Sequence, residues 1–375
     1  MKRWMIIAFS LILLLSQPGL IRADHTEGVE TSANAAILMD QDSGRVLFDK
    51  NPHEKRKIAS ITKIMTAVLA MESGKWEENV EVSQKAAGVE GSSLFLKPGE
   101  HITLQDLTTG LMLRSGNDAA VAIAEHVGGS MDGFIYMMNE KAEEIGMENS
   151  HFTNPHGLDD GDRHYSTAYD MALLMQYAMK NETFRKTTAL EKYKAPQEGE
   201  KWDRIWQNKN KLLTSLYEYS TGGKTGYTKS AGRTLVSTAE KENMGLIAVT
   251  LDAPSDWEDH ISMFNWGFST FDRIQLAEAR ETIPQQEEKK GDLFIPQDFY
   301  YPLMEEEINN VSRSITLDKH YQKNPSGISA AGEIKWTLDN HTIQRMPVML
   351  DKEQEDKTSW FGRVGKFLRL FIGGE

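Results

Sequence analysis

The chain has 375 residues, of which 39% are hydrophobic and 26% charged, so it is long enough for two or more domains with a sizeable core. Its formal net charge of −13 argues against nucleic acid as a partner. It contains no cysteine, which excludes disulfides, thiolate metal sites and Cys–His catalysis.

Residues 1–23 have the pattern of a secretory signal peptide. Lys2 and Arg3 form a positive segment, Met5 to Leu15 is apolar, and Ile21-Arg22-Ala23 resembles a cleavage site, although Ile is not a small residue. A transmembrane anchor is the alternative, but the apolar run is short for a membrane span. We therefore predict an exported, extracytoplasmic protein.

A hairpin and then a helix are predicted next. Residues 35–40 and 45–48 are strand-like and flank the turn signal Gln41-Asp42-Ser43-Gly44. The helix begins near Ser60 and ends before Gly74, with apolar residues at helical spacing in between. Ser60 and Lys63 therefore share one helix face, near an N-terminus that favours negative charge. The alternative is that Ser60 is a plain N-cap and Lys63 a solvated charge.

The middle of the chain is predicted to be helical and the following part to form strands. Thr167 with Asp170 fits a variant of the capping box at the start of the last helix, and Ser166 is a second possible N-cap. Together with the hairpin, the strands form a sheet with an inserted helical lobe, an α/β sandwich. The predicted helices are 104–112, 119–127, 131–145, one from about 166, and 257–271, and the predicted strands are 224–228, 233–239 and 246–252.

A second domain is predicted beyond a shift in composition near Ala277. Residues 284–291 form a polar linker, and 292–303, 311–317 and 328–350 are strand-like, with Asp339-Asn340 as a turn. We therefore predict a catalytic domain at 24–277 and a small, mainly β domain at 278–350.

The C-terminal tail, 351–375, is predicted to contain a cationic amphipathic helix. The apolar stripe within 357–372 has basic residues beside it, Arg363, Lys366 and Arg369. Such a helix suits binding in the plane of an anionic membrane and is too short to span one. Docking on the protein's own body is the alternative.

Two further motifs carry groups suited to catalysis. Ser115-Gly116-Asn117 places a hydroxyl and an amide on a short connection between helices, where a plain loop is the alternative. The same pattern at Ser32-Ala33-Asn34 precedes the first strand and is treated as a chance match. Lys224-Thr225-Gly226 opens a strand with a cation, a hydroxyl and a position without a side chain, where a hairpin turn and an edge strand are the alternative.

The three motifs in this order are the signature of penicillin-binding proteins and class A β-lactamases. From Ala35 to about Phe271 the chain resembles the low-molecular-weight serine D-alanyl-D-alanine carboxypeptidases. Residues 119–130 and 154–171 resemble the sporulation-specific type of endospore-forming bacteria. The resemblance implies a penicillin-binding/β-lactamase-like α/β (α+β) catalytic domain. The runs that carry it are 58–66, 114–118, 156–159 and 224–228.

The resemblance also implies catalytic roles. Ser60 attacks the penultimate D-alanyl carbonyl and forms an acyl-enzyme, and Lys63 takes its proton, which requires a neutral amine. Burial and the positive charge of Lys224 both lower the pKa of Lys63. Ser115 relays a proton to the leaving D-alanine.

Substrate binding is implied for Asn117 and for the Lys224 strand. Asn117 holds the substrate amide, and the oxyanion lies between the backbone N–H groups of Ser60 and Tyr227, beside Gly226. Some relatives carry an Arg in the loop after the last strand, but here 253–259 has no cation. The residues expected to bind the substrate carboxylate are therefore Lys224 and Thr225, or Arg233.

The loop from His156 to His164 contains Asp159, Asp160 and Asp162, which also allows a metal site. The spacings fit known ligand patterns poorly, and the resemblance makes it a structural loop under the cleft. A zinc carboxypeptidase motif, His-Glu-x-x-His, does not occur. No metal or cofactor is implied.

The predicted function is removal of the terminal D-alanine from peptidoglycan stem pentapeptides, which limits cross-linking, in spore cortex if the narrower resemblance holds. β-Lactams are expected to acylate Ser60. One alternative is a β-lactamase, for which no deacylating Glu is identifiable from sequence. The other is a non-catalytic penicillin-sensing or wall-binding protein, against which three intact motifs argue.

Overall fold

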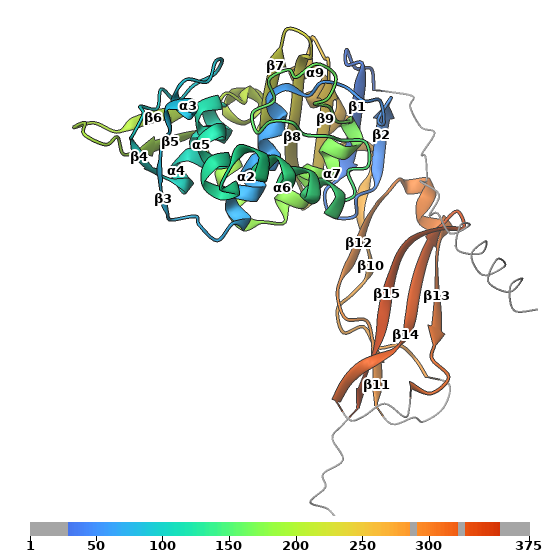
Figure 1. Ribbon diagram of the computed structural model, residues 1–375. Helices are drawn as coiled ribbons and strands as arrows, with labels where there is room; N and C mark the ends of the chain where they lie inside the picture. Colours follow the sequence, from blue (N-terminus) through green and yellow to red (C-terminus); the bar gives the residue numbers. More distant parts are fainter. Residues whose placement is uncertain (1–28, 286–290, 322–326, 353–375) are drawn as a thin grey trace, which may run out of the picture. The chain divides into compact units, whose positions relative to one another are not determined.

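The structure is a computed structural model that describes residues 29–285, 291–321 and 327–352 (Figure 1). The predicted signal peptide and the predicted amphipathic tail lie outside these residues. The chain divides into two compact units between Arg273 and Ile274, four residues before the expected end of the catalytic domain. Among the residues described, no helix is both long and apolar enough to cross a membrane.

The first unit is built on a five-stranded antiparallel sheet in the order β2-β1-β9-β8-β7. Its strands are β1 (Ala35–Asp40), β2 (Val46–Lys50), β7 (Ser220–Thr228), β8 (Gly232–Lys241) and β9 (Met244–Leu251). Every residue of β1 and β9 is buried, which explains why these strands are continuous apolar runs. β7 forms one edge of the sheet.

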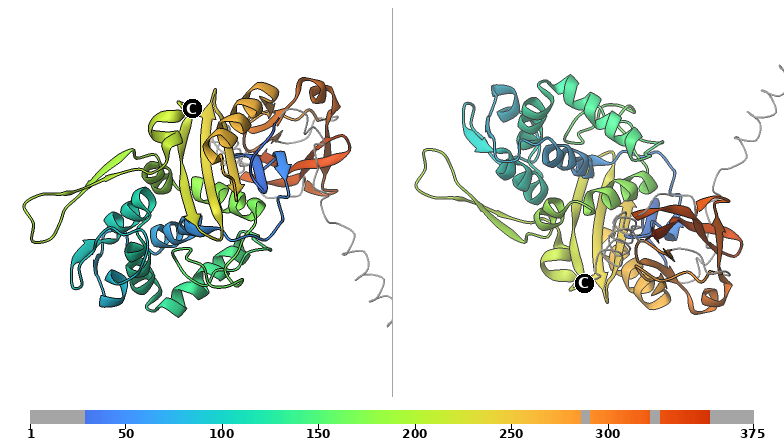
Figure 2. Two further views of the ribbon diagram at one scale, coloured as in Figure 1. Left: turned by 90° about the horizontal axis from the view of Figure 1, so that it is seen from above. Right: turned by 90° about the horizontal axis from the view of Figure 1, so that it is seen from below.

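Helices cover both faces of this sheet (Figure 2). Side chains alternate along a strand, so Ile37 and Met39 of β1 join the core beneath the helical lobe. Leu38, between them, faces the other way and meets Gly267 of α9 (Asp256–Thr270), where a side chain on the glycine would collide with it. The sheet is thus the middle layer of three, as the predicted sandwich requires.

The helical lobe lies between β2 and β7 in the chain. It consists of the 3₁₀ turn η1 (Ala59–Thr62) and the helices α2 (Lys63–Glu72), α3 (Gln84–Ala87), α4 (Leu104–Arg114), α5 (Asn117–Gly128), α6 (Met131–Glu144), α7 (Ala168–Met179) and α8 (Glu182–Thr188). Thr167 caps α7 by accepting a hydrogen bond from the Asp170 N–H. The Asp170 carboxylate accepts from Asn149 and Ser150, not from the Thr167 backbone as a capping box requires.

Several short elements were not predicted. They are the paired strands β3 (Asn79–Glu81) with β4 (His101–Thr103), the paired strands β5 (Lys192–Ala195) with β6 (Arg204–Gln207), and the π-helical turn η2 (Leu212–Leu216). The β5–β6 hairpin projects from the lobe (Figure 2). Strands of three or four residues are too short to show a periodicity of their own.

The second unit is mainly β, as predicted. β11 (Asp292–Phe294), β15 (His341–Lys352), β14 (Gly327–Leu338) and β13 (Val311–Leu317) form one sheet in that order, and β10 (Asp272–Ala277) pairs with β12 (Phe299–Leu303). The 3₁₀ turn η3 (Glu305–Asn310) precedes β13. Asp339 and Asn340 join β14 to β15 with φ angles of 49° and 65°, the two positive values of a type I′ hairpin turn. Buried Trp336 lies in its core.

Candidate active site

Side chains from three separate parts of the first unit meet in one polar cluster. Lys63 Nζ lies 2.9 Å from Ser60 Oγ and 3.3 Å from Ser115 Oγ. Lys224 Nζ lies 3.0 Å from the same Ser115 hydroxyl. The start of α2, the α4–α5 junction and β7 therefore converge as the three motifs predict, and Lys63 links the two serine hydroxyls.

Ser60 lies in the 3₁₀ turn η1, just ahead of α2. The residue at the N-cap of α2 is Thr62, and the Ser60 hydroxyl faces the Lys63 amine. The plain N-cap alternative is therefore wrong. Ala59, which precedes Ser60, has φ of 49°, a left-handed conformation that disfavours a residue with a Cβ by roughly 1–2 kcal/mol. Backbone strain of this kind is common beside reactive groups.

Lys63 is completely buried. Burial lowers the pKa of its amine well below the ordinary value, and the positive charges of Lys224 and Lys209 lower it further. The expected role of Lys224 is thus present but second to burial. A lysine whose pKa is lowered in this way gives up its proton more readily than an exposed one, and its neutral form can accept a proton.

The neighbours of Lys63 suit a neutral amine. Asn117 Oδ1 at 2.6 Å and the His156 carbonyl at 3.0 Å accept the two N–H bonds that a neutral amine offers. The nitrogen lone pair is then left for a hydroxyl proton, and the two hydroxyls within reach are those of Ser60 at 2.9 Å and Ser115 at 3.3 Å. Ser60 is the nearer of the two.

Ser115 and Lys224 form the other half of the cluster. Ser115 ends α4 with φ of 65° and its N–H bonds the Leu111 carbonyl. Burial lowers the pKa of the Lys224 amine to about 7, with a further contribution from Lys209. Besides Ser115, its amine donates to the Thr225 carbonyl at 2.7 Å. This lysine is near its titration point at neutral pH and holds the Ser115 hydroxyl in place.

Asn117 is buried at the start of α5. Its Oδ1 accepts from Lys63 and its Nδ2 donates to the Glu90 carbonyl at 2.7 Å. The structure thus places Asn117 in the cluster as a partner of Lys63. One N–H of the side-chain amide is not used by these two bonds and is the group that a substrate carbonyl could meet.

The strand β7 passes directly beside Ser60. A Cβ at Gly226 would lie 2.9 Å from Ser60 N, closer than real Cβ atoms approach. Only glycine lets the strand come this near. Thr225 is partly buried and Tyr227 is 66% exposed. Because β7 is an edge strand, the cluster opens beside backbone groups suited to binding an extended peptide.

Two cations near the cluster, Arg233 and Lys209, have surroundings that the sequence did not indicate. Arg233 donates twice to the Asp256 carboxylate, at 2.9 and 2.7 Å, so its charge is largely matched. Lys209, which no motif marked, donates to Ser92 Oγ at 3.2 Å and lowers the pKa of both active-site lysines. Only its place in the fold reveals it, because a lysine within a polar stretch carries no signal of its own.

The loop from His151 to Ser166 packs against η1, Lys63 and the end of β7. The His156 carbonyl accepts from Lys63, and Asp159 accepts from Thr228 and Ser230 at the end of β7. His164 bonds Thr62 in the nucleophile turn. In the described part of the chain, no three His, Cys, Asp or Glu residues are grouped so as to hold a metal ion. The loop's polar groups instead bond the nucleophile turn and β7.

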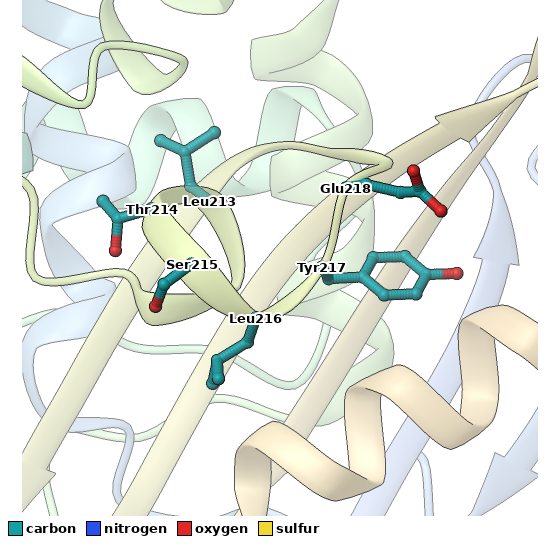
Figure 3. Close-up of a pocket in the computed structure, with 6 residues that line it drawn as sticks. All are labelled: Leu213, Thr214, Ser215, Leu216, Tyr217 and Glu218. Atoms are coloured by element: carbon teal, nitrogen blue, oxygen red, sulfur yellow. The ribbon is translucent and has the colours of Figure 1, made fainter.

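A pocket at η2 is separate from this cluster (Figure 3). It is lined by the run from Leu213 to Glu218, and none of the predicted site residues contributes to it. Tyr217 in its wall stacks on Phe264 of α9. The pocket is therefore no part of the catalytic arrangement.

Comparison with known proteins identifies the family. Residues 22–255 match the family model described as D-alanyl-D-alanine carboxypeptidase, peptidase S11. The chain belongs to this family. The family is one of serine hydrolases, and residues 271–356 match the C-terminal domain of penicillin-binding protein 5.

Individual relatives support this family assignment. The chain is 36% identical to the D-alanyl-D-alanine carboxypeptidase DacF of Bacillus subtilis over 274 residues, 71% of this chain and 70% of the relative. It is 33% identical to DacC of Escherichia coli over 386 residues, 97% of this chain and 94% of the relative. Penicillin-binding protein 5 of Haemophilus influenzae superposes with a TM-score of 0.73 at 28% identity, covering 86% of this chain and 98% of that one. These findings confirm the predicted family, fold class and enzyme class.

Proposed function

We propose that this carboxypeptidase removes the terminal D-alanine of peptidoglycan stem pentapeptides through an acyl-enzyme on Ser60. The observation that carries the proposal is the 2.9 Å contact between Ser60 Oγ and the buried amine of Lys63, whose pKa is strongly lowered. A neutral amine at this distance is a general base for the hydroxyl.

In the acylation step, Ser60 Oγ attacks the penultimate D-alanyl carbonyl carbon while its proton passes to Lys63. The backbone N–H groups of Ser60 and Tyr227 bind the oxyanion, each donor contributing on the order of 3 kcal/mol. Lys63 then returns a proton through Ser115, 3.3 Å away, to the amine of the leaving D-alanine. The C–N bond breaks and an ester remains on Ser60.

In the deacylation step, a water molecule attacks the ester carbonyl and gives its proton to Lys63. The C–O bond to Ser60 breaks, and Lys63 protonates the departing Ser60 oxygen. The same base thus serves both halves of the cycle, and the enzyme needs no cofactor for either half.

The substrate is proposed to lie extended along β7, with Asn117 holding its amide. Its C-terminal carboxylate meets Thr225, Lys224 and Lys209. Lys209 is preferred to Arg233 because Asp256 already matches the charge of Arg233. β-Lactams occupy the same place and acylate Ser60.

The enzyme is proposed to be exported by its N-terminal segment, 1–23, and held at an anionic membrane surface by 357–372. The sequence patterns of the two segments support this. A role in spore cortex rests on the resemblance of 119–130 and 154–171 to sporulation-specific members. Vesicle sedimentation of the full chain, with and without anionic lipid, tests the membrane part; equal recovery on both would contradict it.

The chemical proposal is tested with a synthetic peptide that ends in D-alanyl-D-alanine. Wild type releases D-alanine and is labelled by a fluorescent penicillin, whereas Ser60→Ala does neither. Ser73→Ala, which removes a hydroxyl that bonds the Ala70 carbonyl at the far end of α2, keeps both activities. Labelling that persists in Ser60→Ala would contradict the nucleophile assignment, and β-lactam turnover faster than D-alanine release would favour a β-lactamase.

A further inference from the structure

A buried histidine lies behind the nucleophile turn and contacts none of the catalytic side chains. His164 is 3% exposed, and its Nδ1 accepts from the Thr153 backbone N–H at 3.1 Å. A backbone N–H only donates, so Nδ1 carries no proton and Nε2 carries the one of a neutral ring. His164 Nε2 lies 2.8 Å from Thr62 Oγ1. The ring therefore donates to Thr62.

The bond from His164 determines where the Thr62 hydroxyl points. Thr62 Oγ1 accepts from the ring and has a single proton, which it donates to the Ala59 carbonyl at 2.8 Å. The three bonds run in one direction, from the Thr153 N–H through His164 and Thr62 to the Ala59 carbonyl. Burial lowers the pKa of His164 to about 4, which keeps the ring neutral as this sequence of bonds requires.

The Ala59 carbonyl shares a peptide plane with the Ser60 N–H. In a planar trans peptide these two groups point in opposite directions. The hydrogen bond that draws the Ala59 carbonyl toward Thr62 therefore turns the Ser60 N–H away from the His151–Ser166 loop. The N–H then lies on the side where Gly226 of β7 approaches Ser60 N. Gly157 packs against the other side, since a Cβ there would lie 1.8 Å from the Ala59 oxygen.

We propose that His164 is a positioning residue that acts through Thr62 to aim the Ser60 N–H into the cleft as an oxyanion donor. The inference rests on the proposed function, in which Ser60 is the nucleophile. Ala59 has φ of 49°, so the peptide plane sits in a conformation that the chain does not favour by itself. The bond from Thr62 supplies part of what holds it there.

The test compares two buried threonines of the same segment. Thr62→Val removes the hydroxyl that holds the Ala59 carbonyl, whereas Thr66→Val removes one that bonds the Pro155 carbonyl at 2.6 Å in the same loop. Both variants lose a buried hydrogen bond to a carbonyl, but only the first touches the nucleophile turn. Thr62→Ser keeps the hydroxyl and is the rescue variant.

The measurement is stopped-flow acylation by a fluorescent penicillin over a range of concentrations, with thermal unfolding alongside. We expect the rate constant at saturation to fall on the order of 100-fold in Thr62→Val, as for a small misplacement at a reacting centre. The half-saturating concentration stays unchanged, Thr62→Ser recovers most of the rate, and Thr66→Val keeps the wild-type rate while losing stability. Equal rates in Thr62→Val and Thr66→Val would overturn the inference.

His164→Leu and the double variant with Thr62→Val complete the test. Because both residues act through the same carbonyl, the double variant should be no slower than the slower single variant. Multiplied losses would show that His164 acts by another route and would overturn the inference. Absence of labelling in every protein, wild type included, would overturn the nucleophile assignment and this inference with it.

Discussion

Lys63 and Lys224 are joined through a single hydroxyl, with Ser115 Oγ lying 3.3 Å from one amine and 3.0 Å from the other. Both lysines are buried, and two ammonium groups in such a place repel one another where water does not screen them. The pKa of each is lowered, that of Lys63 far below its ordinary value and that of Lys224 to about 7. The charge of Lys224 is among the causes that lower the pKa of Lys63 and not the reverse, so we expect Lys63 to lose its proton first and Lys224 second.

This difference predicts a bell-shaped dependence of kcat/KM for D-alanine release on pH. Activity rises as Lys63 loses its proton, which happens far below the ordinary range of a lysine because burial lowers its pKa. Activity falls as Lys224 loses its charge above about pH 7. Lys224→Arg keeps a cation at all these pH values, so its alkaline limb should move to higher pH. An alkaline limb that stays in place would assign that titration to another group.

Gly226 allows β7 to approach Ser60 closely, so we predict that a side chain at this position slows acylation. A methyl group at this position would collide with Thr234 Oγ1 and lie 2.9 Å from Ser60 N, so β7 would have to move away from the N–H group proposed to bind the oxyanion. We expect Gly226→Ala to lower the acylation rate by about 10²–10³, comparable to the loss of one oxyanion donor.

The matched control for this change is Gly245→Ala on β9, where the three atoms nearest to the new methyl group all belong to the Gln41 side chain, at 3.2 Å or more. Acylation by fluorescent penicillin and thermal unfolding are measured for both variants. A Gly226→Ala enzyme that acylates as fast as Gly245→Ala would show that the oxyanion lies elsewhere.

The polar cluster around Lys63 was predictable because its residues belong to short sequence motifs. Each motif combines particular residue types at a fixed spacing, next to a helix or strand with clear periodicity. The three motifs are Ser60 with Lys63, Ser115 with Asn117, and Lys224-Thr225-Gly226. The Asp339-Asn340 turn was readable for the same reason, since a two-residue loop between strands needs residues that tolerate positive φ.

The parts that escaped prediction are those determined by contacts between distant segments. His164 bonds Thr62 and Lys209 bonds Ser92, and neither residue belongs to a pattern in its own neighbourhood. The bond from the Asn117 side chain to the Glu90 carbonyl was not predictable either, because the motif indicates a substrate-binding amide but not which protein groups it also bonds. Such pairings depend on the tertiary fold, which local propensity does not specify.

Lys209 predicts a selective loss of binding for substrates that end in a free carboxylate. Lys209→Met removes the cation proposed to meet this group, so KM should rise for a D-alanyl-D-alanine peptide and change little for the same peptide with a C-terminal amide. The removal also relieves the repulsion on Lys63 and Lys224, so the pKa of each should rise and the whole pH profile should move toward higher pH.

Lys211→Met is the control for this change, because Lys211 is an exposed lysine two residues away that is not among the causes of either shift. Steady-state kinetics on the acid peptide and the amide peptide show whether Lys209 binds the substrate carboxylate. Equal effects of Lys209→Met on the acid and the amide would exclude Lys209 from carboxylate binding.

The ion pair between Arg204 and Glu100 predicts a large effect on stability. The pair is buried, with side chains 7% and 5% exposed, and it joins β6 to the end of the loop that contains Ser92. Burial raises the pKa of Glu100, but the hydrogen bonds from Arg204 and from the Lys97 backbone, together with the charges of these two residues, outweigh it, so the pKa is lowered overall. Arg204→Met leaves an unpaired buried carboxylate, which should lower the free energy of unfolding by about 3–5 kcal/mol.

Glu100→Gln in the Arg204→Met background removes the stranded charge and should restore part of this loss, as urea unfolding at pH 7 would show. Because the folded pKa of Glu100 is depressed, the contribution of the pair is present above the ordinary carboxylate pKa and is lost as pH falls through the folded value. Wild type should therefore lose more stability than the double variant on acidification. Equal slopes of stability against pH in the two proteins would mean that the pair contributes no net stability.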